Sequence, residues 1–454
     1  MNSLHAILAA FLLAQARPPE PSYAIVVSKA TQAAWTGVVE ALRAKHGGAA
    51  VVTWEKGVEE ARAELSRVAP RYACFVARPE EADRPFVVAV HRLTRALDDD
   101  PYGDCLWGIL TGYDAADAKR IAERKEPLRV RRALAGTGVP LEIFAEGAWY
   151  SEGEKNVCWR KEKGGLPEKK ACPDDSTQAI VEELNRGCDL FQTSGHATER
   201  DWQIGYSYPN GQFRCAEGKL FGLDLRGGRH PIASPSPKVY SALGNCLMGR
   251  IPDRDAMALA WMHTGGVHQM VGYTVSTWFG YGGWGVHDYF MTGAHTYAES
   301  FFLNNQALVW QLESRFPKHA RVDLDEFGIE SDPNLLPALA RKHGIREKDA
   351  LGLLWDRDTV AFYGDPAWEA RLDRQGDAPF PLTLTEKDGV FTLEGAARAD
   401  GSWGRPPALL LPRRVGKVEL LEGVAIVSDP FVLVPRTGAY KKGDLLRVRF
   451  RAAR

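Results

Sequence analysis

Over roughly the first 125 residues, short hydrophobic runs alternate with segments whose apolar residues recur at helical spacing. The runs predict strands at Tyr23–Val27, Ala49–Trp54, Tyr72–Val76 and Cys105–Thr111, and the periodic segments predict helices at Thr31–Lys45, Val58–Val68, Pro85–Leu97 and Ala115–Arg124. Strands that alternate with helices of this length form a parallel sheet covered on both faces. No glycine-rich turn of the dinucleotide-binding type follows the first strand.

The α/β pattern continues to about Ser300 and then gives way to a pattern of short strands. The clearest later α/β elements are strands at Asp189–Thr193, Val239–Leu243 and Gly266–Val275 and a long helix at Thr296–Phe316. From about Phe380, short strands separated by turn residues are predicted at Leu382–Thr385, Val390–Leu393, Lys417–Leu421, Val424–Ser428, Phe431–Val434 and Leu445–Phe450. This last region predicts a small β-sandwich.

Charge and hydropathy narrow the class of partner. The formal net charge is -1, so no strong field favours nucleic acid or an anionic membrane. The run from Leu4 to Ala14 is too short to span a membrane and ends in Ala14-Gln15-Ala16, a small-x-small cleavage pattern. We therefore expect residues 1–16 to be a signal peptide and the protein to be extracytoplasmic, with no stable membrane insertion; the alternative is an N-terminal helix of the folded chain.

The seven cysteines include no CxxC pair, so a zinc knuckle is not indicated. An odd number leaves at least one thiol unpaired in an exported chain. Cys158 and Cys172 flank a polar loop and are candidates for a disulfide across it.

Two predicted strands end in turns that present reactive side chains. The strand Asp189–Thr193 leads through Ser194 and Gly195 to His196, and the strand Val239–Leu243 leads through Gly244 and Asn245 to Cys246, about 50 residues later. In a parallel sheet, the carboxyl ends of neighbouring strands meet at one edge, where ligand sites lie. We therefore expect His196 and Cys246 to face the same cleft.

This pair suits nucleophilic catalysis. A thiolate attacks a peptide carbonyl, and a nearby imidazole or helix N-terminus favours the thiolate over the thiol. The imidazole can then give a proton to the leaving amine. Taken singly, a cysteine at a strand end is more often a small buried residue, so the argument depends on the two residues together.

The segments Thr193–Trp202, Gly244-Asn245-Cys246 and Gly265–Thr274 resemble the gingipain-like, caspase-fold cysteine peptidases, best over about residues 185–300. The resemblance implies an α/β fold, a parallel-sheet sandwich in two subdomains, followed by an immunoglobulin-like all-β domain. It divides the chain into residues 17–135, an N-terminal α/β subdomain; 136–375, the catalytic subdomain; and 376–454, the β-sandwich. It implies an exported cysteine endopeptidase with Cys246 as nucleophile, His196 as acid and base, and a peptide or protein as substrate.

The resemblance also implies an oxyanion hole made by backbone N–H groups of Cys246 and of Gly195 or Ala197 beside the histidine. The family usually has glycine directly after the histidine, and this chain has Ala197. If that position requires a positive φ, alanine is strained there. The alternative is therefore a weak or inactive relative that binds peptides or envelope proteins.

For substrate binding, the segment after the next strand supplies Thr277, Trp278 and Trp284. Either tryptophan could wall the pocket for the residue before the scissile bond, although packing in the core explains a tryptophan equally well. The family favours Arg or Lys there through a carboxylate, for which Asp201 and Asp288 are the nearby candidates.

No redox or organic cofactor is implied. Two hypotheses of a bound metal ion stay open. The first is a zinc hydrolase built on His263, His268 and His287, although these histidines lack the spacing of a zinc-binding helix. The second is a structural calcium in the oxygen-rich turn Asp98–Asp104, which lacks EF-hand spacing.

Overall fold

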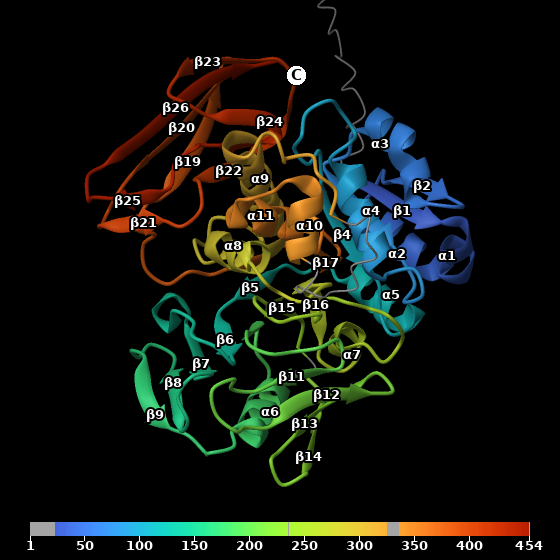
Figure 1. Ribbon diagram of the computed structural model, residues 1–454, viewed down its shortest axis with the longest axis vertical. Coiled ribbons are helices and arrows are strands. Elements are labelled where there is room, and N and C mark those ends of the chain that lie inside the picture. The colour runs from blue at the N-terminus through green and yellow to red at the C-terminus, as the bar shows by residue number, and fades with distance from the viewer. Residues whose placement is uncertain (1–22, 235, 325–335, 454) are drawn as a thin grey trace, which may run out of the picture.

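The computed structural model describes residues 23–234, 236–324 and 336–453, so the predicted signal peptide at residues 1–16 lies outside the described residues. One twelve-stranded sheet runs through the α/β part of the chain (Figure 1). Its order is β2 (Ala50–Trp54), β1 (Tyr23–Ser28), β3 (Tyr72–Val76), β4 (Leu106–Leu110), β17 (Val360–Gly364), β16 (Val267–Tyr273), β15 (Lys238–Ala242), β10 (Leu190–Thr193), β6 (Arg132–Ala135), β7 (Glu146–Tyr150), β8 (Val157–Lys161) and β9 (Glu168–Ala171).

Most neighbours in this sheet are parallel, and β17, β8 and β9 introduce the antiparallel pairs. Strands β1, β15, β16 and β17 are buried at every position, as expected for a sheet covered on both faces. The covering helices are α1 (Lys29–Ala34), α2 (Thr36–Lys45), α3 (Arg62–Val68), α4 (Arg84–Thr94), α5 (Ala115–Glu123), α6 (Thr177–Arg186), α7 (Met257–His263), α8 (Tyr281–Phe290), α9 (Tyr297–Arg315), α10 (Leu336–His343) and α11 (Lys348–Arg357). Two short 3-10 helices lie at Val58–Ala61 and Leu141–Ile143.

Alternation along β10 shows which helices cover which face. Phe191 packs against Trp202, Phe213 and Trp261, the last of which belongs to α7. Gln192 points to the opposite face, where its side-chain oxygen accepts a hydrogen bond from His287 of α8 at 2.9 Å. Helix α8 therefore covers the face of the sheet opposite to α7.

Smaller sheets surround this core. An antiparallel sheet of β11 (Asp201–Gln203), β12 (Gln212–Ala216), β13 (Lys219–Leu223) and β14 (Arg229–Ile232) separates β10 from β15 in the chain, and β5 (Leu128–Val130) pairs with β18 (Ala370–Leu372). The C-terminal region contains β19 (Leu382–Lys387), β20 (Val390–Ala396), β26 (Leu445–Ala452) and β23 (Val418–Glu422) in one sheet, and the pairs β21 (Gly401–Trp403) with β25 (Gly438–Tyr440) and β22 (Ala408–Val415) with β24 (Ile426–Leu433). The predicted fold class, a mainly parallel α/β sheet followed by antiparallel β-sheets, is confirmed.

Several predicted elements differ in detail. The helix expected over Thr31–Lys45 is two helices, because Trp35 leaves the helical conformation. The strands expected at Val424–Ser428 and Phe431–Val434 are the single strand β24, which continues through Pro430. Pro430 is tolerated because β24 pairs with β22 alone and its other side is an edge.

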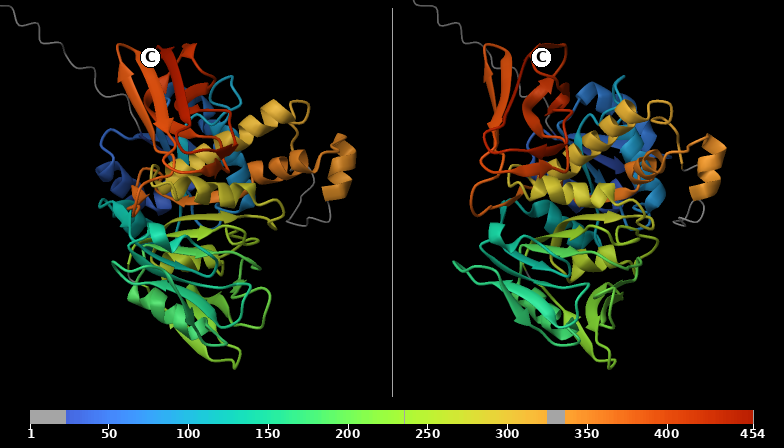
Figure 2. Two further views of the ribbon diagram at one scale, coloured as in Figure 1. Left: turned by 90° about the vertical axis from the view of Figure 1, so that its left-hand side faces the viewer. Right: turned by 60° about the vertical axis from the view of Figure 1, so that its left-hand side comes forward.

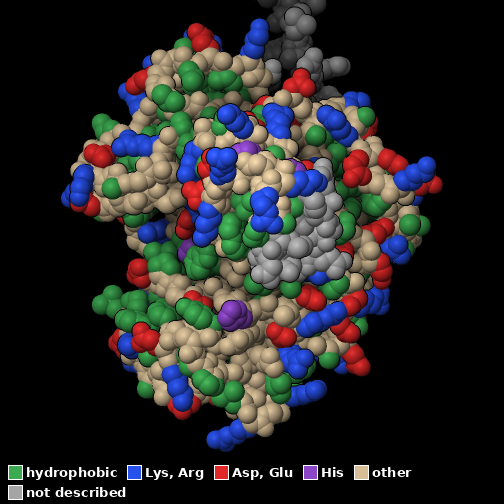
Figure 3. All heavy atoms as spheres, in the orientation of Figure 1, with side chains coloured by type: hydrophobic (Ala, Val, Ile, Leu, Met, Phe, Trp, Pro, Cys, Tyr) green, Lys and Arg blue, Asp and Glu red, His purple; other side chains and the backbone are tan. Residues whose placement is uncertain are grey.

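The surface and the described helices have the following features. Figure 3 shows side chains of both charges spread over one face, with hydrophobic side chains gathered at its left edge, near β6 to β8. Among the described helices, none combines the length and the apolar character that crossing a membrane requires. Cys158 of β8 and Cys172, directly after β9, are both free thiols whose side chains interact, and the disulfide between them stays a prediction.

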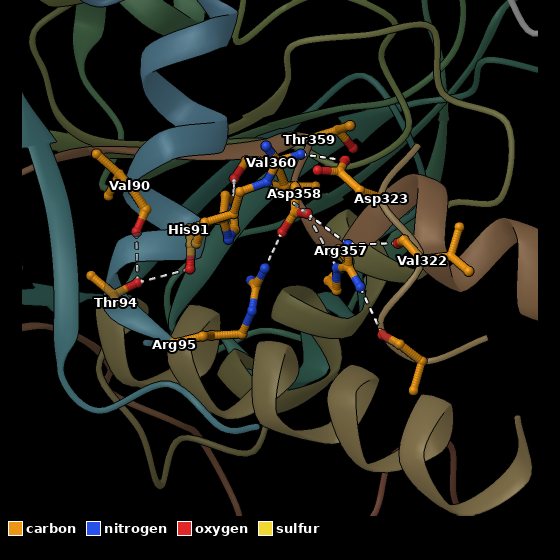
Figure 4. Close-up of polar contacts among 12 residues, drawn as sticks. Val90, His91, Thr94, Arg95, Val322, Asp323, Arg357, Asp358, Thr359 and Val360 are labelled. Atoms are coloured by element: carbon orange, nitrogen blue, oxygen red, sulfur yellow. Dashed lines mark hydrogen bonds and ion pairs between the residues drawn. The ribbon is translucent and has the colours of Figure 1, made fainter. Parts of the chain in front are cut away.

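A buried polar cluster fixes α4 against the end of α11 and the start of β17 (Figure 4). His91 donates a hydrogen bond from Nε2 to the Val360 carbonyl at 2.8 Å, and burial lowers the pKa of His91 to about 4. Asp358 is bound by Arg95 and Arg357. Burial alone would raise the pKa of Asp358, but Arg357 and Arg95 hold it below its ordinary value.

The C-terminal domain packs on α9 and β4 through a shared hydrophobic cluster that includes Phe302, Phe431 and Leu433 (Figure 2). Next to this cluster, carboxylate oxygens of Asp98, Asp104 and Asp429 lie within 4.8 Å of one another. Asp98 and Asp104 belong to the oxygen-rich turn that the sequence offers as a candidate calcium site. Here Arg414 already bridges two of the carboxylates, because its guanidinium contacts both Asp104 and Asp429.

We predict that the contribution of Asp104 and Asp429 to the free energy of unfolding falls as pH rises from about 5 to 9. Burial raises the pKa of Asp104 to about 8 and that of Asp429 to about 7, against about 3.9 in an unfolded chain. In this pH range these carboxyls bind more protons in the folded state than in the unfolded state. Their contribution to stability is complete at low pH and is lost as the pH rises through the folded-state pKa values. The slope is roughly 1 kcal/mol per pH unit for each net proton. Urea unfolding of Asp104→Asn should show a flatter profile than the unmodified chain, and an equal slope would contradict the assignment.

Candidate active site

The turns that carry His196 and Cys246 leave the same edge of the sheet. Strands β10 and β15 are parallel neighbours, with Thr193 paired to Ala242, and the N–H of Leu243 donates to the Thr193 carbonyl at 3.0 Å. Three residues after Thr193 the chain reaches His196, and four residues after Ala242 it reaches Cys246. Parallel pairing therefore brings together two turns that are distant in the sequence.

Asn245 joins these turns. Its side chain is fully buried, its Oδ1 accepts from Thr193 Oγ1 at 2.6 Å, and its Nδ2 donates to the Gly195 carbonyl at 3.0 Å. The residue before Cys246 is thus bonded to the residue before His196. A buried amide whose two ends are both used holds its partners firmly, because separating them leaves polar groups unpaired.

Cys246 is half-buried, and its sulfur lies against a third loop. The backbone N–H of Thr277 points at Cys246 Sγ, with an N···S distance of 3.3 Å, and Thr277 Oγ1 donates to the Asn245 carbonyl at 3.1 Å. Leu247, directly after the nucleophile, has a φ of +58°, a conformation that is rare for a bulky residue and is found at functional turns.

His196 is exposed, and the ring of Tyr206 lies 6.4 Å away in an edge-to-face arrangement. A hollow of about 380 Å³ opens beside it, lined also by Asp201, Gln203 and Asn210. Cys246 does not line this hollow. The histidine and the cysteine therefore lie at one edge of the sheet, in turns joined by Asn245, and the hollow is lined by the histidine and not by the cysteine.

The proposed oxyanion donors are available. Among the described residues, no hydrogen bond uses the backbone N–H of Gly195, Ala197 or Cys246. The positive φ of this turn, +87°, falls on Gly195, and Ala197 is not among the residues with positive φ. Alanine in place of the family's glycine is therefore accommodated without backbone strain.

Glu152, in the turn after β7, is an acid that the sequence analysis did not identify. One carboxylate oxygen accepts from Thr137 Oγ1 at 2.8 Å, while the other is buried without a partner. That second oxygen lies 3.8 Å from the position that a Cβ on Gly195 would take, and the Glu152 carbonyl accepts from the N–H of Tyr206. Burial raises the pKa of Glu152. The only signal in the sequence was an acidic residue after a β-rich run.

Two of the three predicted substrate-binding residues reach the cysteine loop. Thr277 contacts Cys246 directly, and Trp284 Nε1 is 3.5 Å from the Cβ position of Gly244. Trp278 is half-buried beside Phe279, and the ammonium of Lys348 lies 5.8 Å from its ring, so it faces α11. Among the described residues, no hydrogen bond or ring interaction links Trp278 to Cys246.

The two carboxylates considered for basic specificity lie apart from the sulfur. Asp288 forms an ion pair with Arg405 at 3.0 Å on the side of α8 that faces the C-terminal domain. Asp201 lines the hollow beside His196.

The three histidines of the zinc alternative do not gather. His263 binds Asp117 at 2.7 Å, His268 binds the Gly266 carbonyl at 3.1 Å, and His287 binds Gln192. Their rings are held by different partners, and no group of metal-ligand type in the described part of the chain contains them. The hypothesis of a zinc site built on these three histidines is therefore wrong.

Comparison with known proteins gives no sequence match: no family model and no curated protein matches the chain. By structure, the chain is similar to the complex of Porphyromonas gingivalis RgpB pro- and mature domains, with 11% identity, a TM-score of 0.42, and coverage of 94% of this chain and 99% of that one. It is also similar to the Arg-specific cysteine proteinase gingipain R (RGPB), with 11% identity, a TM-score of 0.40, and coverage of 93% of each chain. At this identity the similarity concerns the architecture and assigns no residue.

We predict that Asn245→Ala destabilises the chain by about 1–3 kcal/mol, because it leaves Thr193 Oγ1 and the Gly195 carbonyl without their partner. The two turns should then separate, so the accessibility of Cys246 to iodoacetamide should change as well. Urea unfolding and the alkylation rate check this. Ser314→Ala, at an exposed hydroxyl on α9, is the control and should leave both unchanged. Stability equal to that of the control would contradict the linking role of Asn245.

Proposed function

We propose that the chain is a cysteine endopeptidase with Cys246 as nucleophile and His196 as acid and base. The observation that carries the proposal is the junction of the two turns, in which Asn245 bonds to Gly195 and the Thr277 N–H is directed at the Cys246 sulfur. A donor on the sulfur, an imidazole on the adjoining turn and unused backbone N–H groups are the parts that acyl transfer requires.

The reaction proceeds in two halves. The thiolate of Cys246 adds to the scissile carbonyl, and the N–H groups of Cys246 and of Gly195 or Ala197 bind the resulting oxyanion. Protonated His196 gives its proton to the leaving amine, and a thioester remains. His196 then takes a proton from water, which attacks the thioester, and collapse of the second intermediate releases the acid and the thiolate.

Glu152 would act as a positioning residue in this scheme. Its unpartnered oxygen lies behind the Gly195–His196 turn, and its backbone holds Tyr206, which packs on the His196 ring. Specificity for basic residues is part of the proposal only through Asp201, since Asp288 is paired with Arg405.

A second candidate is a non-catalytic relative that binds peptides. The exposure of His196, and a hollow that omits Cys246, favour it. The two candidates differ in the reactivity of the sulfur, because a protein that only binds peptides does not require an activated thiolate.

We predict that iodoacetamide at neutral pH modifies Cys246 before any other cysteine, and that a peptidyl acyloxymethyl ketone does the same. Burial raises the pKa of Cys188 to about 11 and those of Cys172 and Cys215 to about 12, so these thiols stay protonated. Peptide mapping by mass spectrometry locates the label. Cys246→Ala should abolish hydrolysis of an unfolded protein substrate, by about 10³-fold or more, and His196→Ala should lower kcat by about 10²–10⁴-fold.

Glu152→Gln tests the orientation of His196 in the same assay, because it keeps the shape and removes the charge. It should lower kcat and change the pH profile, whereas a merely structural effect would change stability alone. Cys215→Ala removes a half-buried thiol away from the site and is the control for the effects of substituting and purifying a variant. A Cys246 that resists both reagents would reject the enzyme and leave the peptide-binding candidate.

We also propose export through residues 1–16. A secreted reporter fused to residues 1–20 should leave the cytoplasm, and a matched fusion in which Leu8 and Leu12 are replaced by Arg should not, because charge disrupts the hydrophobic region. Cytoplasmic retention of both fusions would reject export.

A further inference from the structure

A pocket of about 530 Å³ lies between α8 and the C-terminal domain, away from the hollow beside His196. Helix α8 and the residue after it contribute His287, Asp288 and Met291, and the C-terminal domain contributes Phe380, Trp403 and Tyr440. Figure 1 shows α8 next to the strands of that domain. We call this space the interdomain pocket. Its volume and its position between domains are typical of ligand sites.

One face of α8 connects this pocket to the candidate active site. Trp284, His287 with Asp288, and Met291 are spaced three to four residues apart, so they form a single stripe on the helix. Trp284 lies beside Gly244, two residues before Cys246, and the next turn of the stripe already lines the pocket. The stripe is about 10 Å long at 1.5 Å per residue. An extended peptide covers that distance with roughly three residues.

The walls of the pocket are suited to an aromatic guest. The rings of Phe380, Trp403 and Tyr440 lie 4.7, 4.9 and 5.2 Å from one another, and those of Phe380 and Trp403 are only half-buried. The guanidinium of Arg436 lies 4.9 Å from the Trp403 ring and holds it. Grouped rings with free edges bind a further ring in offset or edge-to-face geometry.

The charged groups around the pocket are already engaged. Arg405 is paired with Asp288 and lies 3.7 Å from the centre of the Tyr281 ring. Arg374 donates from Nη1 to the carbonyls of the three residues that follow it. Burial lowers the pKa of His287, and it lowers the pKa of His295 to about 3, so both rings are neutral at neutral pH. The pocket therefore favours a neutral guest over an anion or a cation.

We propose that the interdomain pocket is a substrate subsite that takes an aromatic side chain of the bound peptide, three or four residues from the scissile bond. The proposal rests on the proposed peptidase function. It gives the C-terminal domain a part in substrate selection, because two of the three rings come from strands β21 and β25 of that domain.

The test uses the full chain and a peptide series. A cleavable core sequence is first identified from a digest of an unfolded protein, and a single Phe is then moved through each position of that core in an alanine background. Phe at the third or fourth position from the scissile bond should raise kcat/KM about tenfold over Ala, mainly through KM, which corresponds to burying one ring. Trp403→Ala should bring the Phe peptide to the rate of the Ala peptide.

Trp310→Ala, at a half-buried tryptophan of α9 outside the pocket, is the matched control and should keep the Phe preference. If Trp403→Ala does not fold, Phe380→Leu keeps an apolar side chain and should reduce the preference to a smaller extent. A preference that survives in Trp403→Ala, or no preference at any position, overturns the subsite.

A binding measurement separates the two proposals. Fluorescently labelled Phe and Ala peptides are titrated into Cys246→Ser, and the anisotropy gives Kd without turnover. If Cys246 of the unmodified chain resists alkylation while Phe-peptide binding depends on Trp403, the peptidase fails and the aromatic pocket stands. If Cys246 is alkylated and peptides are cleaved with equal affinity for Phe and Ala, the peptidase stands and the subsite fails.

Discussion

The buried amide of Asn245 is the contact on which the geometry of the candidate site depends. Parallel pairing of β10 and β15 brings two strand ends together, but it does not fix the turns beyond them. Asn245 does so, because it bonds to the last residue of one strand through Oδ1 and to Gly195 through Nδ2. The bond to Thr193 is fully buried and cannot be exchanged for water, so the relative placement of the turns is coupled to the stability of the core.

Helix α8 is the second support, and a glycine allows it to come close enough. A Cβ on Gly283 would lie 1.9 Å from the Leu243 carbonyl oxygen, so any other residue would push the helix away from the end of β15. Asp356 holds the first turn of α8 by accepting from the Gly282 N–H and from Tyr273, each at 2.9 Å. Burial raises the pKa of Asp356 to about 6. Trp284 is placed beside Gly244 as a result.

The sequence was sufficient for those parts of the site that local pattern determines. A strand that runs into small residues and then presents His196 or Cys246 is visible in the sequence, and parallel topology brings the two together. The features that the sequence did not reveal depend on residues that lie far apart along the chain. Strand β17 lies some 90 residues beyond β16 and yet pairs with both β16 and β4, joining the two halves of one sheet. Glu152 is placed by Tyr206, and Trp278 turns toward α11 because Lys348 and Phe279 surround it.

The seven thiols of the chain lie in different surroundings. Burial raises the pKa values of Cys74, Cys105, Cys172, Cys188 and Cys215, which disfavours their thiolates. Cys246 shares its partial exposure with Cys172 and Cys215, and it differs from them in that the backbone N–H of Thr277 points at its sulfur. Oxidation and alkylation both proceed through the thiolate, so burial protects these five thiols without requiring disulfides. The same packing that builds the sheet therefore disfavours the thiolates of these five cysteines.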